Sequence, residues 1–156
     1  MEQHNISNIT ENVQNIENKN LFVHILEPEF LPIETVYVSI SKLNEIPNSD
    51  IGNIFIGDTL DYIDYSEAAN ILDLVSEKMS TNNALIVQGA DLFQLAVAIS
   101  CHEIDEETAK EILYKHKKSI YNIYDIESEL VNRKFKIVEK KYINIFEYYI
   151  KALKYE

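Results

Sequence analysis

Three acidic side chains form the densest group of chemically competent residues in the chain. Asp58, Asp61 and Asp64 lie within seven residues of one another, and clustered carboxylate oxygens can bind a hard cation. The calcium-loop pattern is not present, because no glycine stands at the turn position and no Glu closes the loop. We therefore expect a solvated acidic loop that caps a helix.

A thiol and an imidazole stand next to each other at Cys101 and His102, the groups that a cysteine nucleophile and its base would provide. Neighbours in sequence rarely face each other, so a base for Cys101 would have to come from elsewhere in the fold. We expect Cys101, which ends an apolar stretch, to be a small core residue. The four His residues have no metal-ligand spacing, and we expect no metal site.

Glycine is scarce in this sequence. The 156 residues include only three glycines, Gly52, Gly57 and Gly89, which lie far apart. A loop whose backbone lies against phosphate or ribose normally needs several glycines close together. The sequence therefore predicts no such loop.

The formal charge of -12 is distributed unevenly along the chain. Residues 1–109 carry 19 acidic residues and three Lys, whereas residues 110–156 carry 11 basic and seven acidic residues. An acidic body repels nucleic-acid phosphates, so duplex binding is not expected, and Lys115–Lys118 is interpreted as a solvated helix end. With one Cys and no apolar run long enough for a membrane span, we expect a cytoplasmic chain.

Four apolar residues, Ile6, Ile9, Val13 and Ile16, form one narrow helical stripe near the start of the chain. Residues 1–20 are therefore expected to form an N-terminal arm or a short docking helix, which packs on its own domain or on a partner. Residues 21–156 form the main domain, with Ser66 as the expected cap of its longest helix. Strands are predicted at 21–26, 36–40, 51–56, 84–87 and 135–140, helices at 66–79, 91–100, 105–115 and 124–132, and either type at 142–153.

This order of elements resembles that of class I S-adenosylmethionine (SAM)-dependent methyltransferases, from about residue 21 to residue 154. The most similar stretch runs from Ile54 to Ile63, where Leu60-Asp61-Tyr62 stands in place of the family's frequent Leu-Glu-His. The resemblance implies a three-layer, Rossmann-like α/β fold with a mainly parallel sheet. It also implies a C-terminal antiparallel strand pair, at residues 135–138 and 144–149.

The family's first strand ends in a Gly-rich loop that lies against the cofactor, and this sequence has no such loop. We therefore expect the first strand to be missing or replaced. Glu27 stands where the family places an acid that holds the ribose hydroxyls. The resemblance implies that Gly57, Asp58, Thr59 and Leu60 are the other cofactor-binding candidates, and it assigns no catalytic residue.

These observations predict a methyltransferase-like domain that has lost SAM binding and acts as a binding or structural module. Ten Tyr residues favour a protein partner or self-association, and neither duplex nucleic acid nor membrane is an expected partner. Richness in Ile, Asn and Lys is typical of AT-rich genomes, so a viral or phage assembly is one expected setting, with a virion-associated location. The alternative is an active SAM-dependent methyltransferase on an unknown acceptor, alone or completed by a partner subunit.

Overall fold

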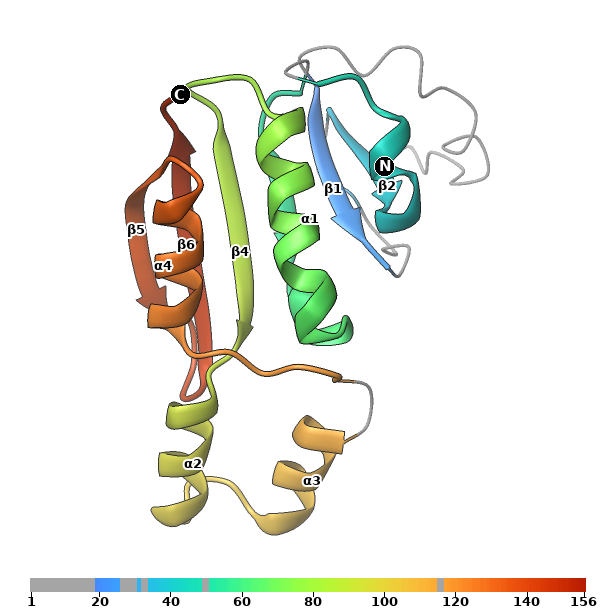
Figure 1. Ribbon diagram of the computed structural model, residues 1–156. Coiled ribbons are helices and arrows are strands. Elements are labelled where there is room, and N and C mark those ends of the chain that lie inside the picture. Colours follow the sequence, from blue (N-terminus) through green and yellow to red (C-terminus); the bar gives the residue numbers. More distant parts are fainter. Residues whose placement is uncertain (1–18, 26–30, 32–33, 49–50, 115–116) are drawn as a thin grey trace, which may run out of the picture.

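Six strands form one sheet in the order β2-β1-β3-β4-β6-β5 (Figure 1). The computed structural model describes residues 19–25, 31, 34–48, 51–114 and 117–156, so the predicted docking helix, apart from its last two residues, lies outside the described residues. The first four strands are parallel, and β6 pairs antiparallel with β4 on one side and with β5 on the other. The strand bounds are β1 Asn20–His24, β2 Thr35–Ser39, β3 Ile54–Gly57, β4 Ala84–Ala90, β5 Phe135–Tyr142 and β6 Glu147–Lys154.

The segment that fitted both a strand and a helix pattern contains strand β6. Its residues are buried alternately, with Tyr148, Ile150 and Ala152 fully buried on one face. Side chains of a strand alternate between the two faces of a sheet. This period of two is therefore expected for β6, which lies between β4 and β5 and pairs with both. The predicted mainly parallel sheet with a C-terminal antiparallel pair is confirmed.

Strands β1 and β3 are direct neighbours in the sheet. Leu21 is in register with Ile54, and the Leu21 amide donates to the carbonyl of Asn53 at 2.9 Å. No strand therefore lies between them. Strand β1 itself stands beside β3 in the inner part of the sheet, with β2 as the outer strand on that side.

One face of the sheet is covered by helices α1 (Tyr65–Lys78) and α4 (Ile123–Asn132) and by the 3-10 helix η3 (Ile40–Glu45) (Figure 1). A second 3-10 helix, η4 (Thr59–Tyr62), leads from β3 into α1. Apolar side chains of these elements and of the inward-facing strand positions form the main core. Helix α1, for example, contributes Ala68, Leu72 and Val75, whose spacing of four and three residues places them on one side of the helix.

The cap of α1 differs from the prediction. The chain is still extended at Asp64, whose carbonyl accepts the amides of Glu67 and Ala68, so the helix begins at Tyr65. Ser66 consequently lies inside the first turn. The prediction of Ser66 as the cap was wrong, because the cap position is Asp64, two residues earlier.

Helices α2 (Leu92–Ser100) and α3 (Glu106–Tyr114) extend beyond the carboxyl edge of the parallel strands (Figure 1). They have a small core of their own, formed around Ala90, Leu95 and Ile120. The acid Asp91 caps α2, as its carboxylate accepts the amides of Phe93 and Gln94. Among the described residues, no helix combines the length and apolar character needed to cross a membrane.

Candidate functional site

The carboxyl ends of β1 and β3 form the switch point of the sheet. From β1 the chain continues to β2 on one side, whereas from β3 it continues to β4 on the other side. In open α/β sheets, ligands bind in the crevice outside the strand ends at such a point. His24 ends β1 and Asp58 follows β3, so these two residues stand at the centre of the candidate site.

Four side chains meet there, and we call His24, Asp58, Thr59 and Tyr62 the switch-point cluster. His24 Nε2 lies 3.0 Å from Asp58 Oδ1, and Thr59 Oγ1 donates to the carbonyl of Val23 at 3.0 Å. The Tyr62 ring meets the His24 ring edge-on, with centroids 5.6 Å apart. These contacts join the end of β1 to the turn after β3.

Two groups in the cluster have shifted pKa values. Burial alone would raise the pKa of Asp58, but the hydrogen bond and charge of His24, with a smaller effect of Lys117, hold this pKa below its usual value. Burial and the neighbouring carboxylate of Asp58 raise the pKa of the Tyr62 hydroxyl. The cluster therefore favours an ionised Asp58 beside an un-ionised Tyr62.

A second carboxylate, Asp61, is fully buried next to the cluster. Its Oδ2 accepts from the Ala90 amide at 3.1 Å and from Lys117 Nζ, and its carbonyl accepts the amides of Lys118 and Ser119. Burial raises the pKa of Asp61 to about 6, even though the Lys117 charge opposes this shift.

These contacts correct two predictions. The acidic loop is not solvated throughout, because Asp61 is fully buried, whereas the side chains of Asp58 and Asp64 are 44% and 62% exposed. In the Lys115–Lys118 run, predicted as a solvated helix end, Lys117 is not solvated, because its side chain is only 14% exposed, whereas that of Lys118 is 58% exposed. Both predictions rested on charge alone, and the sequence holds no signal that pairs residues 56 positions apart.

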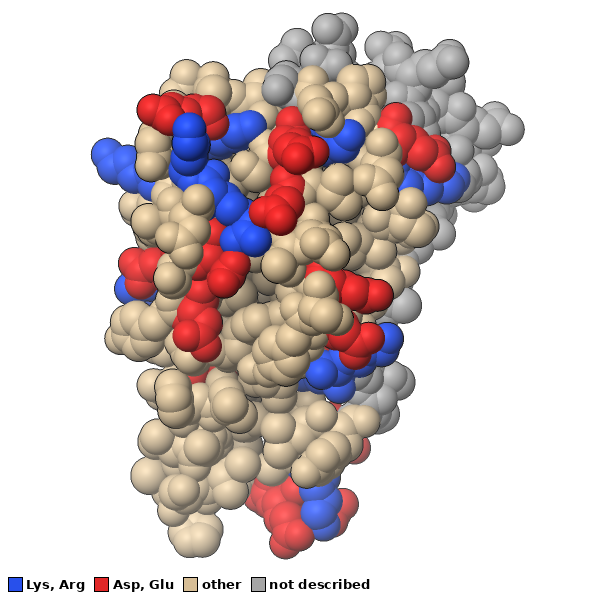
Figure 2. Space-filling model, in the orientation of Figure 1, with Lys and Arg blue, Asp and Glu red and all other residues tan. Residues whose placement is uncertain are grey.

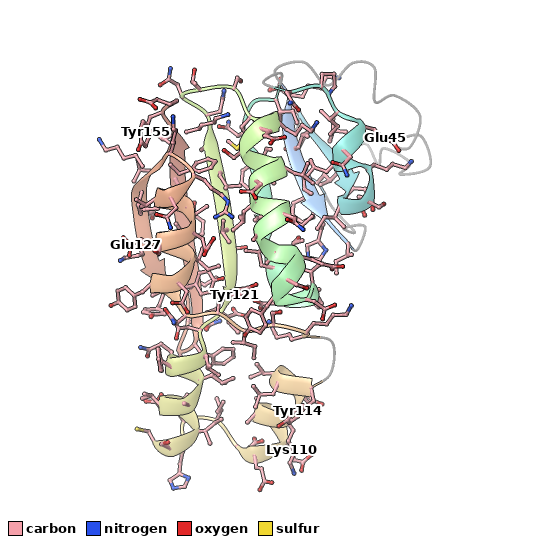
Figure 3. The ribbon with its side chains drawn as sticks, viewed as in Figure 1. Glu45, Lys110, Tyr114, Tyr121, Glu127 and Tyr155 are labelled. Atoms are coloured by element: carbon pink, nitrogen blue, oxygen red, sulfur yellow. The ribbon has the colours of Figure 1, made fainter. Side chains whose placement is uncertain are left out.

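Three polar atoms beside Asp61 are buried and have no hydrogen-bond partner among the described residues. They are Asp61 Oδ1, Tyr121 Oη and Tyr148 Oη. A Cβ at Gly89 would stand 2.7 Å from Tyr148 Oη and 2.8 Å from Asp61 Oδ1, so only glycine fits there. Figure 3 shows Tyr121 at the carboxyl edge of the sheet, above the α2–α3 pair.

The predicted cofactor residues have different surroundings in the structure. Asp58 and Thr59 belong to the switch-point cluster, Gly57 precedes it with a φ of 50°, and the Leu60 side chain is buried in the main core. Glu27 lies outside the described residues. The assignment of these five residues to a cofactor therefore stays a prediction.

Sequence reasoning missed His24, Tyr62 and Lys117, which complete this site. His24 is one of four scattered His residues and stands inside the apolar run 21–26, so the sequence does not show that the strand ends there. Its partner Asp58 is 34 residues away, and no local pattern links the two. Tyr62 had been noted only as the last residue of the Leu60-Asp61-Tyr62 triplet.

Cys101 is exposed, so its prediction as a core residue was wrong. It follows α2, which buries only Leu95 and Ala98 and leaves its other apolar side chains half-buried or exposed. The apolar composition of α2 had suggested a core helix. Among the described residues, no group of three His, Cys, Asp or Glu side chains is arranged to hold a metal ion.

No protein-family model matches the sequence, and no curated protein matches it either. Solved structures do match. A SAM-dependent methyltransferase from Archaeoglobus fulgidus superposes with a TM-score of 0.60 and 13% identity, over 88% of this chain and 86% of the other. Magnesium protoporphyrin IX methyltransferase from Synechocystis PCC 6803, solved with bound SAH, gives 0.58 and 11%, over 90% and 76%.

A third similar structure is a putative methyltransferase from Haloferax volcanii, in complex with the Trm112 methyltransferase activator. It superposes with a TM-score of 0.62 and 4% identity, over 90% of this chain and 83% of the other. Identities this low bear on the fold and not on the activity. The resemblance in element order is confirmed at that level: this chain has the fold of class I SAM-dependent methyltransferases.

Proposed function

We propose that this chain is a methyltransferase-fold domain that has lost SAM binding and acts as a protein-binding module. The observation that carries the proposal is the switch-point cluster. His24 and Asp58 bond to each other across the crevice between β1 and β3, and Thr59 bonds to β1. The side chains that would face a cofactor are thus engaged with one another.

The described residues also do not fit an adenosyl group. A nucleoside that lies flush against the backbone needs positions without a Cβ, but the described residues at the end of β1, Leu21 to Ile25, include no glycine. The His24 side chain is only 8% exposed, between the rings of Phe22 and Tyr62. A bound adenosyl group would have to displace this ring.

Nucleoside binding can be tested with the full chain and S-adenosylhomocysteine (SAH). Titration calorimetry should give no dissociation constant tighter than about 1 mM, a binding free energy of roughly -4 kcal/mol. The amide resonances of Gly57 and Gly52 serve as site and control reporters, because Gly57 adjoins the cluster and Gly52 lies before β3. Neither resonance should move.

Micromolar binding with a shift confined to the Gly57 resonance would contradict the loss of SAM binding. It would support the alternative, an active methyltransferase that uses SAM on an unknown acceptor. Binding that appears only after addition of a second protein would support completion by a partner subunit. The Haloferax neighbour, which was solved with an activator protein, makes that arrangement worth testing.

The binding surface that we propose is formed by α2 and the adjacent β5–β6 turn. Leu92, Phe93 and Val97 are 46 to 63% exposed on α2, and Ile143 and Ile145 are exposed in the turn. The turn adjoins α2 through a hydrogen bond from the Asp91 amide to the Phe146 carbonyl. Figure 2 shows this part of the molecule, at the lower left, without charged side chains. Exposed apolar surface of this kind typically marks an interaction site.

We propose a second copy of the chain as the occupant of this surface. The chain has a net charge of -12, so two copies repel each other over most of their surface. A two-fold contact through α2 brings together the same uncharged surface from both copies and keeps the acid-rich regions apart. Such a contact is compatible with the expected self-association.

The self-association proposal predicts a particle of about twice 18.1 kDa by size-exclusion chromatography with light scattering. Phe93→Glu combined with Val97→Glu should give a monomer, because each substitution places a charge in the contact. Val131→Glu is the matched control, as Val131 is 50% exposed on α4, away from α2, and it should leave the dimer intact. A wild-type monomer would contradict the proposal.

A further inference from the structure

The sheet has a second apolar face, opposite the face that α1 covers. Strand register places Tyr37, Phe22, Phe55, Ile86 and Lys151 in one continuous row across β2, β1, β3, β4 and β6. The first four are half-buried and do not belong to the main core, and they alternate along their strands with positions that do. This row, which we call the open-face row, therefore faces away from α1 and α4.

No helix among the described residues covers the open-face row. Helix α1 contacts both η3 and α4, which places the three in one layer, and α2 and α3 lie beyond the carboxyl edge of the sheet (Figure 1). Half-buried aromatic and aliphatic side chains in a continuous row are typical of a surface that another element covers. The described residues do not include a helix that covers this row.

We propose that residues 1–18 of the same chain pack across the open-face row as a helix. The stripe of Ile6, Ile9, Val13 and Ile16 provides one apolar side of such a helix. From Ile6 to Ile16 a helix rises about 15 Å, at ~1.5 Å per residue. The open-face row crosses four strand spacings, or about 19 Å. Its four apolar members, from Tyr37 to Ile86, cross three of these spacings, or about 14 Å, so the stripe and the apolar part of the row match in length.

The attachment point and the charge of the segment support the same face. The Lys19 carbonyl accepts the Gly52 amide at 3.2 Å, so the segment joins the sheet at the amino ends of β1 and β3, between the two halves of the row. Residues 1–18 include three Glu and no Lys or Arg. The β5–β6 half of the open face carries Lys136, Lys141 and Lys151 together with Glu139 and Glu147, a net charge of +1 that weakly attracts the acidic segment. This inference goes beyond the proposed function and does not depend on it.

Methyl NOE spectroscopy on the full chain tests the contact directly. We expect cross-peaks between the methyl groups of Ile9 or Val13 and those of Ile86. In a mixture of labelled and unlabelled chains these cross-peaks should remain intramolecular. Intermolecular cross-peaks would assign the face to a second copy, and their complete absence would show that the segment does not pack there. Either result would overturn the proposal.

Two matched pairs of substitutions provide a second measurement. Ile9→Asp with Val13→Asp places two charges on the stripe, and the melting temperature should fall by roughly 5 °C or more. Ser7→Asp with Gln14→Asp adds the same charge on the opposite side of the helix and should leave the melting temperature nearly unchanged. Equal effects of the two pairs would overturn the proposal. If the first pair prevents folding, the NOE measurement on the wild-type chain decides.

Discussion

At the scale of single residues, the buried carboxylate of Asp61 does most to organise the carboxyl edge of the sheet. Its side chain accepts from Ala90 and Lys117, and its carbonyl holds the chain at Lys118 and Ser119. One residue therefore connects η4, the end of β4 and the segment that follows α3. Since the contacts join three remote parts of the chain, the state of this carboxylate affects the stability of the whole edge.

The raised pKa of Asp61 predicts how the free energy of unfolding depends on pH. The folded protein binds this proton more tightly than the unfolded chain, since the pKa rises from 3.8 to about 6 on folding. The free energy of unfolding should therefore increase as pH falls from about 7 to about 4, by on the order of 2 to 3 kcal/mol. Denaturant unfolding at several pH values measures this slope.

Two isosteric variants identify the source of the slope. Asp61→Asn should abolish it, because no proton is taken up at that position. Asp64→Asn should retain it, because Asp64 is 62% exposed and lies 3.9 Å from Lys118. The prediction is wrong if Asp61→Asn keeps the wild-type slope between pH 4 and pH 6.

The residue scale is also where sequence reasoning failed most. Composition correctly indicated that Gly57 and Asp58 stand at a strand end, since an apolar run stops there. It could not indicate that His24 bonds to Asp58 or that Lys117 reaches Asp61, because these pairs are 34 and 56 residues apart. Local patterns carry burial and capping preferences, whereas such pairs follow only from the strand order.

At the scale of elements, Asp91 joins three of them at one point. Its Oδ1 caps α2 through Phe93 and Gln94, while its Oδ2 accepts the Ile123 amide at the start of α4 and the Tyr142 hydroxyl at the end of β5. The residue is 1% exposed. The side chain of a helix cap ordinarily bonds only to its own helix. The Asp91 side chain also holds α4 and the end of β5 against α2.

We expect Asp91→Ala to lower the free energy of unfolding by about 3 kcal/mol, since a cap and two further buried hydrogen bonds are lost. Asp105→Ala is the matched control. Asp105 accepts the Thr108 amide at the start of α3 but is fully exposed, so its loss should have a much smaller effect. Denaturant titration of both variants measures the difference, and equal losses would contradict the joining role of Asp91.

Most elements could be predicted from the sequence, for a physical reason. Strands β1, β3 and β4 each contain a short continuous apolar run because they are central to the sheet, and α1 and α4 show clear apolar stripes because each packs on one side. The last segment is ambiguous in sequence, because its apolar residues Ile143, Phe146, Ile150 and Leu153 also fit a helical stripe. In the structure β6 forms a strand because it pairs with β5, which directly precedes it, and with β4, which lies about 60 residues earlier in the sequence.

At the scale of the whole molecule, the chain has two cores of very different size. The main core includes side chains from every strand, from η3 and from α1 and α4. The smaller one consists of Ala90, Leu95 and Ile120, with a few partly buried neighbours. Burial of apolar surface supplies most of the folding free energy, so the α2–α3 pair depends on a much smaller contribution than the sheet.

This difference predicts that the α2–α3 pair opens without unfolding the sheet. Helix α3 buries only Ala109, whereas α1 buries four side chains, so the amides of Glu106–Tyr114 should exchange at least about 10-fold faster than those of Tyr65–Lys78. Native-state hydrogen exchange with mass spectrometry measures both peptides in one sample. Asp91→Ala should speed exchange in α2 further, because Asp91 caps α2 and bonds it to the start of α4. Equal protection of α1 and α3 would mean that the two cores unfold as one unit.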